Sequence, residues 1–421
     1  MRRTARRLLP NELLRRVYRL EAAHYLAGLD VSIDQSKKTI IAINHFWNQD
    51  LRALAQASTE YNFVVVDAPI LFKGAKLYFS GDVQDMRVPY LSEPVEHRLC
   101  WRTECRYILN LLLERFGVDL VIAPDDAFYW FRELTDLLHD RGTPVVIVEK
   151  EGTRNSYLME AESRRVRENA PCKADRVYVW SERQRLYWNK AGVVYDKIEL
   201  LGQPRSDLFH TEERRDLDTM FSQVRPIVTL FSYEDDAYIM PELARAEGLN
   251  WLEMKAATHD AFAAVASQHP QYNYVIKTHP QQADLDMLKD RYQLDNLIVL
   301  GGSSTANELL RRSELIIAFQ TTGVIEAMFL NKPIIYTHWD PLLKRLEDEL
   351  LPFHRAPGIV VVRSCDELRV GMENFLEGRR NAFHFPESEI NSRNRFVNEY
   401  FFNPDGHVCE RFFASVGILL K

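Results

Sequence analysis

Short apolar runs rich in valine and isoleucine alternate with longer amphipathic segments through most of the chain. In the first half, six such runs are predicted to be strands: 37–44, 62–69, 119–124, 144–150, 176–180 and 197–202. Segments with apolar residues at helical spacing separate them, among them 47–58, 105–117 and 131–142. Buried strands that alternate with amphipathic helices predict a parallel sheet covered by helices on both faces.

The alternation stops at a polar and charged stretch, 202–226, and then resumes. The second series predicts strands at 226–232, 272–277, 296–302, 314–319, 332–337 and 358–362. The chain is therefore predicted to be an α/β protein with two Rossmann-like domains and a cleft between them, and ligands of such sheets bind beyond the carboxyl ends of the strands. The predicted parts are an N-terminal helix, two domains and a C-terminal helix, at 1–30, 31–210, 211–400 and 401–421.

Composition narrows the class of partner. The 421 residues are 46% hydrophobic and carry a formal net charge of −7, which argues against a nucleic-acid binder because phosphates need a dominant positive field. Small molecules or proteins are the expected partners. The five cysteines form no CxxC pair and no cluster with zinc-ligand spacing, so a reducing cytosol is expected and no metal site is predicted.

The first 30 residues form a basic amphipathic pattern, with seven arginines beside leucines in the first 20 positions. No apolar run approaches the ~18–20 residues of a membrane span, and there is no signal-peptide pattern, so a cytoplasmic location is predicted. The pattern fits a helix that lies on the cytoplasmic face of the inner membrane. It equally fits a helix packed on the first domain with a solvated arginine face.

The stretch YVIKTHP, residues 274–280, ends a predicted buried strand on a base and a rigid turn. Lys277 and His279 stand where the strand becomes a loop, and Pro280 fixes the backbone so that a helix can begin at once. A histidine there can donate to a phosphate oxygen, and Lys277 adds charge. A histidine that only caps the sheet edge explains the same pattern.

A second polar loop, QTTG at 320–323, contains Thr321, Thr322 and Gly323 and feeds a predicted helix. Hydroxyls and free backbone N–H groups at a helix N-terminus suit a phosphate. Glu326 lies one turn into the helix, where its carboxylate can accept both hydroxyls of a ribose. The alternative is an N-capping threonine with a first-turn glutamate, which stabilises a helix by about 1 kcal/mol.

Three serines complete the predicted phosphate site. Ser303 and Ser304 lie in the turn GGSS, and Ser232 follows the strand at 226–232. Carboxyl ends of parallel strands meet at one edge of a sheet, so these loops are expected to converge with His279, as a nucleotide phosphate requires.

At these motifs the second half resembles the donor-binding domain of GT-B glycosyltransferases. The resemblance is to the bacterial surface-polysaccharide group, which includes capsule Kdo transferases, bacterial polysialyltransferases and CDP-glycerol glycerophosphotransferases. It is carried by THP at 278–280 and QTTGVIEA at 320–327, and more weakly by GQPRSD at 202–207 and NPDGHVCERF at 403–412. It implies a GT-B fold, a nucleotide-sugar donor on the second domain, an acceptor on the first, and no cofactor or metal ion.

The resemblance also implies roles for single residues. His279 and Pro280 match the motif that contacts the donor phosphate, and Thr321, Thr322 and Glu326 match positions that hold phosphate and ribose.

In the first domain, VVIVEKEG at 145–152 is similar to an acidic-acidic-glycine motif, with Lys150 in place of the first acidic residue. Glu151 is the predicted base that takes a proton from an acceptor hydroxyl, with Glu149 as the alternative. A solvated charged turn is the other interpretation of this stretch.

Weaker candidates lie elsewhere. Asn44 and His45 end the first strand and are predicted to touch an acceptor sugar, although a helix cap and a core aromatic explain them as well. Arg205 is predicted to approach the donor phosphate or to pair with Asp207. The aspartate pairs at 125–126 and 235–236 lack a third ligand, so neither predicts a metal site.

Together these features predict a glycosyltransferase of bacterial surface-polysaccharide biosynthesis. It would move a sugar from a nucleotide donor, CMP- or CDP-linked by resemblance, to a glycan or glycolipid acceptor, with Glu151 as base and His279 stabilising the leaving phosphate. The alternatives are polyol-phosphate transfer of the CDP-glycerol type, chemistry like that of UDP-N-acetylglucosamine 2-epimerase, and a non-catalytic scaffold on the same fold.

Overall fold

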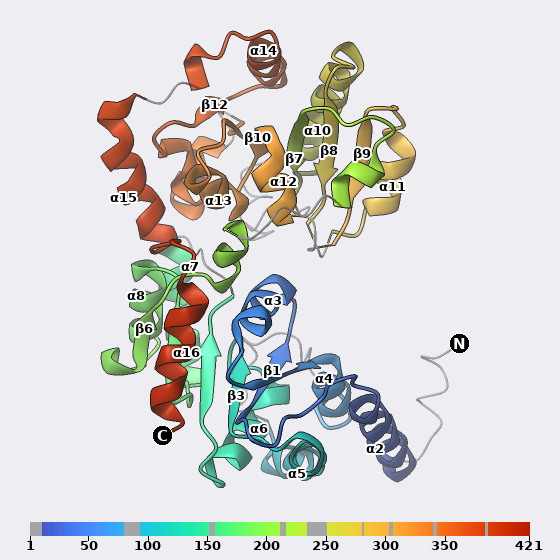
Figure 1. Ribbon diagram of the computed structural model, residues 1–421, viewed down its shortest axis with the longest axis vertical. Helices are drawn as coiled ribbons and strands as arrows, with labels where there is room; N and C mark the ends of the chain where they lie inside the picture. The colour runs from blue at the N-terminus through green and yellow to red at the C-terminus, as the bar shows by residue number, and fades with distance from the viewer. Residues whose placement is uncertain are drawn as a thin grey trace. The chain divides into compact units, whose positions relative to one another are not determined.

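The computed structural model describes residues 11–79, 93–150, 156–210, 216–233, 251–279, 282–302, 306–339, 343–383 and 386–421. The chain divides into two compact units. Unit 1 comprises Met1–Glu151, Met159–Asp207 and His407–Lys421, and unit 2 comprises Gly152–Leu158 and Leu208–Gly406. Each unit contains one six-stranded sheet with helices around it (Figure 1).

The sheet of unit 1 is parallel throughout, with the strand order β2-β1-β3-β4-β5-β6. Its strands are β1 (Thr39–Asn44), β2 (Asn62–Asp67), β3 (Leu120–Ala123), β4 (Val145–Val148), β5 (Arg176–Val179) and β6 (Ile198–Leu200). Each strand lies within one of the six apolar runs of the first half, so those predictions are confirmed. The order is that of a doubly wound sheet, with its switch point between β1 and β3.

Helices α2, α4, α5 and α6 pack together on one face of this sheet. Their core includes Ile41 and Ile43 of β1, while the alternation of a strand turns Ile40 and Ala42 to the opposite face. The helical elements in the chain before β7, together with the closing helix, are α2 (Asn11–Ala27), α3 (Asn48–Ala57), α4 (Pro69–Ala75), α5 (Val95–Phe116), α6 (Tyr129–His139), α7 (Ser156–Asn169), α8 (Glu182–Lys190), α16 (Val408–Leu419), and the 3-10 helices η2 (Tyr195–Lys197), η3 (Pro204–Phe209) and η4 (Asp216–Met220).

Helix α2 packs on unit 1. Tyr18 and Leu26 are buried in its core. Arg15 and Arg19 both donate to the buried carboxylate of Glu104, at 3.0 and 2.8 Å. Residues 11–27 therefore take the packed position that was one of the two interpretations of the N-terminal pattern, whereas residues 1–10 lie outside the described part of the chain.

The closing helix α16 also belongs to unit 1. Asp207 accepts hydrogen bonds from the first two backbone N–H groups of this helix, at 3.0 and 2.7 Å. The hydroxyls of Tyr178 on β5 and Ser415 on α16 lie 3.0 Å apart. The end of the chain is thereby attached to the first sheet.

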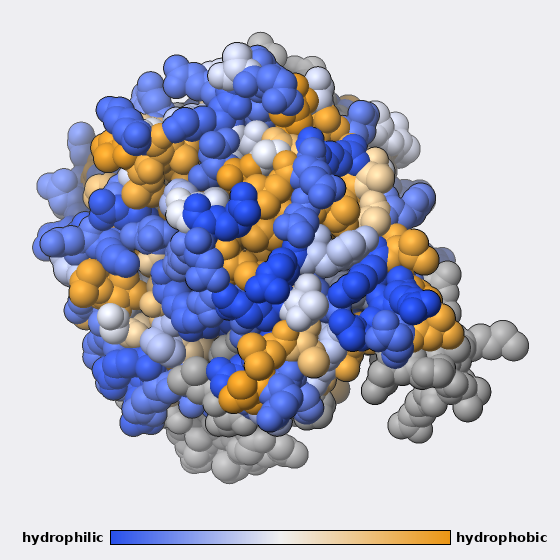
Figure 2. Space-filling view, turned by 90° about the horizontal axis from the view of Figure 1, so that it is seen from below, coloured by the Kyte–Doolittle hydropathy of each residue, from blue (hydrophilic) through white to orange (hydrophobic). Residues whose placement is uncertain are grey.

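No helix among the described residues is long and apolar enough to cross a bilayer. The face drawn in Figure 2 mixes hydrophilic residues with several groups of hydrophobic ones.

The sheet of unit 2 is also parallel, with the order β12-β11-β10-β7-β8-β9. Counted from its own first strand this is the Rossmann order 3-2-1-4-5-6, so the prediction of an α/β protein with two Rossmann-like domains is confirmed. Its strands match the second series of apolar runs to within two residues at each end: β7 (Ile227–Phe231), β8 (Asn273–Lys277), β9 (Leu297–Leu300), β10 (Ser313–Ala318), β11 (Ile334–Thr337) and β12 (Val360–Val362).

Helices surround this second sheet and share one apolar core with it. Helix α10 packs against α14, and α13 packs against α12 and α15. The helical elements of the unit are α10 (Trp251–Gln268), α11 (Leu285–Arg291), α12 (Ala306–Arg312), α13 (Gly323–Phe329), α14 (Cys365–Leu376), α15 (Ile390–Tyr400), and the 3-10 helices η5 (Leu343–Glu349), η6 (Pro352–Arg355), η7 (Asn381–Phe383) and η8 (Glu387–Glu389).

Candidate functional site

The carboxyl ends of the unit 2 strands gather several of the polar residues singled out in the sequence. Strands β10, β7 and β8 are neighbours and run parallel, so the residues that follow them lie at one edge of the sheet. Ser232 follows β7, His279 follows β8, and Thr321 and Thr322 follow β10. The strand order reverses between β7 and β10, and such a switch point is where open α/β sheets bind ligands.

Ser232 lies at the centre of a hydrogen-bonded group. Its hydroxyl accepts a hydrogen bond from Gln282 Nε2 at 3.0 Å and lies 3.0 Å from His259 Nε2. Through its Oε1, Gln282 also accepts from the backbone N–H of His279 at 3.0 Å. The Gln282 amide therefore ties the loop after β8 to the serine after β7.

His259 reaches Ser232 from helix α10 and is almost fully buried. Burial, followed by the nearby charge of Lys255, lowers the pKa of His259 to about 4. The imidazole is therefore neutral at pH 7, with one nitrogen donating and the other accepting. In the tautomer with hydrogen on Nε2, His259 donates to Ser232 and leaves the serine hydroxyl hydrogen for a ligand oxygen.

Lys277 is buried behind the same loop. Its Nζ donates to the backbone carbonyls of Thr278, at 2.8 Å, and of Gly302. Burial lowers the pKa of Lys277 to about 8. The ammonium thus braces the loops after β8 and β9, and its predicted contact with a phosphate stays a prediction.

The turn after β10 is held by Gln320, whose φ of 44° lies in the left-handed region that few residues other than glycine adopt. Its Nε2 donates to the Tyr336 hydroxyl at 2.6 Å and to the Leu351 carbonyl at 2.9 Å, and its Oε1 accepts from the Leu351 N–H at 2.9 Å. Three side-chain bonds therefore fix the conformation of this turn.

The same turn presents two hydroxyls. Thr321 and Thr322 are half-buried, and the Thr321 hydroxyl accepts from the N–H of Gly323 at 3.3 Å. Gly323 begins α13, which has seven residues. Glu326 is buried at 5% exposure on this helix, so its predicted contact with a ribose requires the side chain to become accessible.

Arg205 lies in unit 1. Its guanidinium donates to Asp50 at 3.1 Å and stacks over the Trp180 ring at 4.8 Å. The expected pairing with Asp207 is wrong, because Asp207 instead accepts from the backbone N–H groups at the start of α16. The predicted approach of Arg205 to a donor phosphate stays a prediction.

Asn44 ends β1 and His45 follows it, at the switch point of unit 1. The Asn44 amide donates to Asn48 and to Asp67, both at 2.7 Å. The buried His45 ring lies 4.9 Å from that of Phe128 and 5.5 Å from that of Trp130, within an aromatic group. His45 therefore makes the core aromatic contacts of its alternative interpretation, whereas the Asn44 amide bonds two side chains and does not cap α3, whose N-cap residue is Trp47. The predicted contact of both residues with an acceptor stays a prediction.

The first aspartate pair is buried and binds backbone. Asp125 accepts from the N–H of Ala127 at 2.7 Å, and Asp126 accepts from the N–H groups of Lys173 and Ala174 at 2.5 and 3.1 Å. These bonds give both carboxylates a structural role.

Several predicted residues lie outside the described part of the chain: Glu151, Pro280, Ser303, Ser304 and the aspartate pair at 235–236. Glu149, the alternative for the base, is described. It is buried and accepts a hydrogen bond from Trp188 Nε1 at 2.8 Å.

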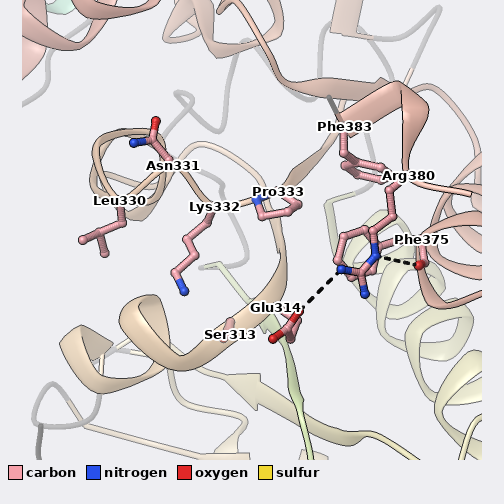
Figure 3. Close-up of a pocket in the computed structure, with 9 residues that line it drawn as sticks. All are labelled: Ser313, Glu314, Leu330, Asn331, Lys332, Pro333, Phe375, Arg380 and Phe383. Atoms are coloured by element: carbon pink, nitrogen blue, oxygen red, sulfur yellow. Dashed lines mark hydrogen bonds and ion pairs between the residues drawn. The ribbon is translucent and has the colours of Figure 1, made fainter. Parts of the chain in front are cut away.

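A pocket of about 340 Å³ lies at the amino ends of the unit 2 strands, opposite the candidate site, beside the start of β10 and just before β11 (Figure 3). Arg380 at its rim lies 3.7 Å from Glu314 and donates to the Phe375 carbonyl at 3.4 Å. None of the predicted site residues lines it. Its lining is Ser313, Glu314, Leu330, Asn331, Lys332, Pro333, Phe375, Arg380 and Phe383.

Sequence reasoning missed His259 and Gln282. The only signal for His259 was a histidine inside the mostly apolar stretch AATHDAFAAV, at 256–265. Gln282 follows Pro280 by two positions and looks like an ordinary loop residue. Their convergence on Ser232 depends on the packing of α10 against the sheet, which sequence periodicity does not give.

No protein-family model matches this chain, and no curated protein matches it. Solved structures do. The chain is similar to the UDP-GlcNAc 2-epimerase of Neisseria meningitidis, at 12% identity and a TM-score of 0.52, over 90% of this chain and 100% of that one. It is also similar to a putative UDP-N-acetylglucosamine 2-epimerase of Listeria monocytogenes, at 12% identity and a TM-score of 0.53, over 90% and 96%.

A third similar structure is the UDP-GlcNAc 2-epimerase of Methanocaldococcus jannaschii, at 15% identity and a TM-score of 0.52, over 91% of this chain and 99% of that one. Identities this low establish the fold. The chain has the two-domain α/β fold of the GT-B type, as these epimerases do.

Proposed function

We propose that this chain is an enzyme that acts on a nucleotide-activated sugar, and that the carboxyl edge of the unit 2 sheet holds the nucleotide phosphates. The observation that carries the proposal is the group of polar side chains around one switch point: Ser232, His279, Thr321 and Thr322. Hydroxyls and imidazole N–H groups are donors suited to phosphate oxygens. The similar Neisseria epimerase was solved with UDP-GlcNAc bound, which supports the substrate class.

Within this proposal, Ser232 and His279 donate to phosphate oxygens, and Gln282 and His259 position them. The Gln282 amide holds the His279 backbone and the Ser232 hydroxyl at 3.0 Å each, so neither has to be ordered when the ligand arrives. Donors fixed before reaction stabilise the negative charge that develops when a sugar–phosphate bond breaks.

For the reaction itself, the fold neighbours favour 2-epimerisation of a UDP-N-acetylhexosamine. Epimerisation at a carbon that carries hydrogen breaks and re-forms the C–H bond, which needs a base within reach. It needs no acceptor, so the sugar nucleotide is the only organic substrate.

Glycosyl transfer is the second candidate, and the motifs THP at 278–280 and QTTGVIEA at 320–327 favour it. In this version unit 2 binds a CMP- or CDP-linked donor, unit 1 binds a glycan or glycolipid acceptor, and Glu151 is the base. Polyol-phosphate transfer uses the same parts with a different donor.

Incubation with UDP-GlcNAc in D2O, with and without oligosaccharide acceptors, separates these reactions. An epimerase produces a second, deuterium-labelled sugar nucleotide without acceptor. A transferase releases nucleotide only when acceptor is present. Because the transferase candidate uses a CMP- or CDP-linked donor, sugars linked to CMP and CDP are tested in the same way. No reaction with any of these substrates, together with no thermal stabilisation by UMP, UDP, CMP, CDP or GDP, contradicts the proposal and favours the scaffold. A ligand at 100 times its Kd adds about 2.7 kcal/mol, which is easily visible.

The His279→Ala variant tests the site. Loss of a preorganised donor to the phosphate is expected to lower turnover by at least ~10²-fold. His269→Ala is the matched control, because His269 lies in the same unit just after α10, before β8 begins. Near-normal turnover by a folded His279→Ala variant rules out the assignment.

A further inference from the structure

Three potential metal ligands meet at the carboxyl end of β11. His338 directly follows this strand, Glu347 lies in η5, and His354 lies in η6. One ligand atom from each comes within 4.8 Å of the other two. The spacing 338, 347 and 354 matches no common zinc motif, which is why the sequence predicted no metal site.

The distances place the carboxylate against both rings. His338 Nε2 lies 3.7 Å from Glu347 Oε1, and His354 Nε2 lies 3.7 Å from Glu347 Oε2. The two imidazoles are stacked, with centroids 4.5 Å apart and planes at 11°. Both Nε2 atoms therefore approach the same carboxylate.

Burial makes this group unusual. The side chain of His338 is 0% exposed and that of His354 is 5% exposed. Neither ring nitrogen of His354 has a hydrogen-bond partner among the residues that the structure describes. A buried polar atom without a partner costs about 1–3 kcal/mol, so native proteins rarely keep one unless a water molecule, a ligand or an ion satisfies it.

We propose that His338, Glu347 and His354 bind one divalent ion of the zinc type and that this ion fastens η5 and η6 to the end of β11. Two imidazoles and a carboxylate are a ligand set that zinc accepts, with one position left for water. The site is additional to the proposed function.

Binding of an ion requires the three side chains to move closer together and the two stacked rings to turn. Ligand atoms around tetrahedral zinc lie about 3.3 Å apart, given bonds of about 2.0–2.1 Å. The two separations of 3.7 Å must shorten by about 0.4 Å. The rings must also tilt from their parallel stacking so that both Nε2 atoms point at one centre.

Arg355 provides support outside the ligand set. Its guanidinium donates to Glu347 Oε2 at 2.8 Å and is 62% exposed. It can keep orienting the carboxylate or turn into solvent when an ion takes that oxygen. Partners of this kind orient metal ligands in protein sites.

The test is zinc titration into the chelator-treated full chain, followed by calorimetry and by metal analysis after dialysis. One zinc per chain is expected, with a rise in melting temperature on addition. Cobalt used as a probe should give the visible absorption of a tetrahedral site. His354→Ala is expected to weaken zinc binding by more than ~10²-fold, because loss of even an outer partner weakens binding about 10–100-fold.

Two further variants keep the outcome decisive. Glu347→Gln keeps the shape of the side chain but removes its charge. It therefore tests zinc binding even if His354→Ala fails to fold. His269→Ala removes a histidine outside the group and is expected to bind zinc normally. No zinc uptake by the native chain, or equal uptake by His354→Ala or Glu347→Gln, overturns the proposal.

Discussion

At the residue scale, the loop after β8 depends on a lysine that is buried where a charge is unfavourable. Lys277 is 3% exposed, and its ammonium donates to two backbone carbonyls. Burial lowers its pKa to about 8 from the 10.5 of a free lysine. The unfolded chain therefore holds this proton more tightly than the folded chain between about pH 8 and pH 10.5.

The folded chain should therefore gain stability as the pH rises above about 8. Below pH 8 both states carry the proton and the full cost of the buried charge is present. As pH rises towards 10.5 the folded state releases its proton first, so the contribution of Lys277 to stability rises by up to about 1.4 kcal/mol per pH unit.

Lys277→Met is expected to remove this rise. Between pH 7.5 and 9.5 the melting temperature of the native chain should increase relative to that of the variant, by about 2–4 °C for each 1 kcal/mol. Other groups titrate alike in both proteins, so the difference isolates Lys277. If the melting temperatures of the native chain and the variant change by the same amount across this pH range, the assignment of a buried, charged lysine is contradicted.

At the scale of elements, one buried carboxylate adds to the apolar packing that holds helix α2 in unit 1. The Glu104 side chain is fully buried on α5 and accepts from Arg15, Arg19 and Tyr78. Burial acts to raise the pKa of Glu104, but the hydrogen bonds from Arg19, Arg15 and Tyr78 outweigh it and hold the pKa below its usual value.

Glu104→Gln is expected to loosen this attachment. The two arginines are 31% and 35% exposed, so the loss at pH 7 should be about 2 kcal/mol rather than the 3–5 kcal/mol of a fully buried pair. A depressed carboxyl pKa contributes stability above the unfolded value near 4.3, and this is lost as pH falls through the folded value.

Limited proteolysis and melting at pH 7 and pH 3.5 measure this effect. The difference between native chain and variant should be largest at pH 7 and shrink at pH 3.5. Faster cleavage within α2 in the variant is expected as well. An equal difference at both values would show that packing rather than charge holds the helix.

Elements were the most predictable part of this protein. Buried parallel strands are continuous apolar runs, so a strand such as β8 is visible in the letters NYVIK alone. The edge that carries Ser232, His279 and Thr321 follows from the parallel strands. The contacts of His259 and Gln282, and the meeting of His338 with His354, depend on where helices and loops pack in three dimensions, so periodicity cannot reveal them.

At the scale of the whole molecule, the two units share a plan but not a strand order. In unit 1 the strand order reverses between β1 and β3, with two strands on one side of this switch point and four on the other. In unit 2 it reverses between β7 and β10, with three strands on each side, which is the Rossmann order. Such a fold supports transfer and epimerisation alike, so the reaction is decided by side chains and not by the sheets.

Membrane association also belongs to the whole molecule. Helix α2 buries one face in unit 1 but leaves Leu13, Val17 and Leu20 at least 42% exposed, at helical spacing, beside the exposed Arg16. The first ten residues add four arginines. Apolar residues beside arginines suit an anionic bilayer surface, so the chain is expected to pellet with anionic vesicles and not with neutral ones.

The vesicle test uses replacement rather than deletion, because removing α2 would expose the core of unit 1. Each arginine near an anionic surface contributes about 1 kcal/mol, so replacing the four arginines of residues 1–10 by glutamine should weaken binding by up to about 10³-fold. Leu20→Ser should weaken it separately, through lost apolar contact. Because surface attraction is screened, raising salt should release the native chain. Equal pelleting of the native chain and both variants would mean that this segment does not hold the protein at a membrane.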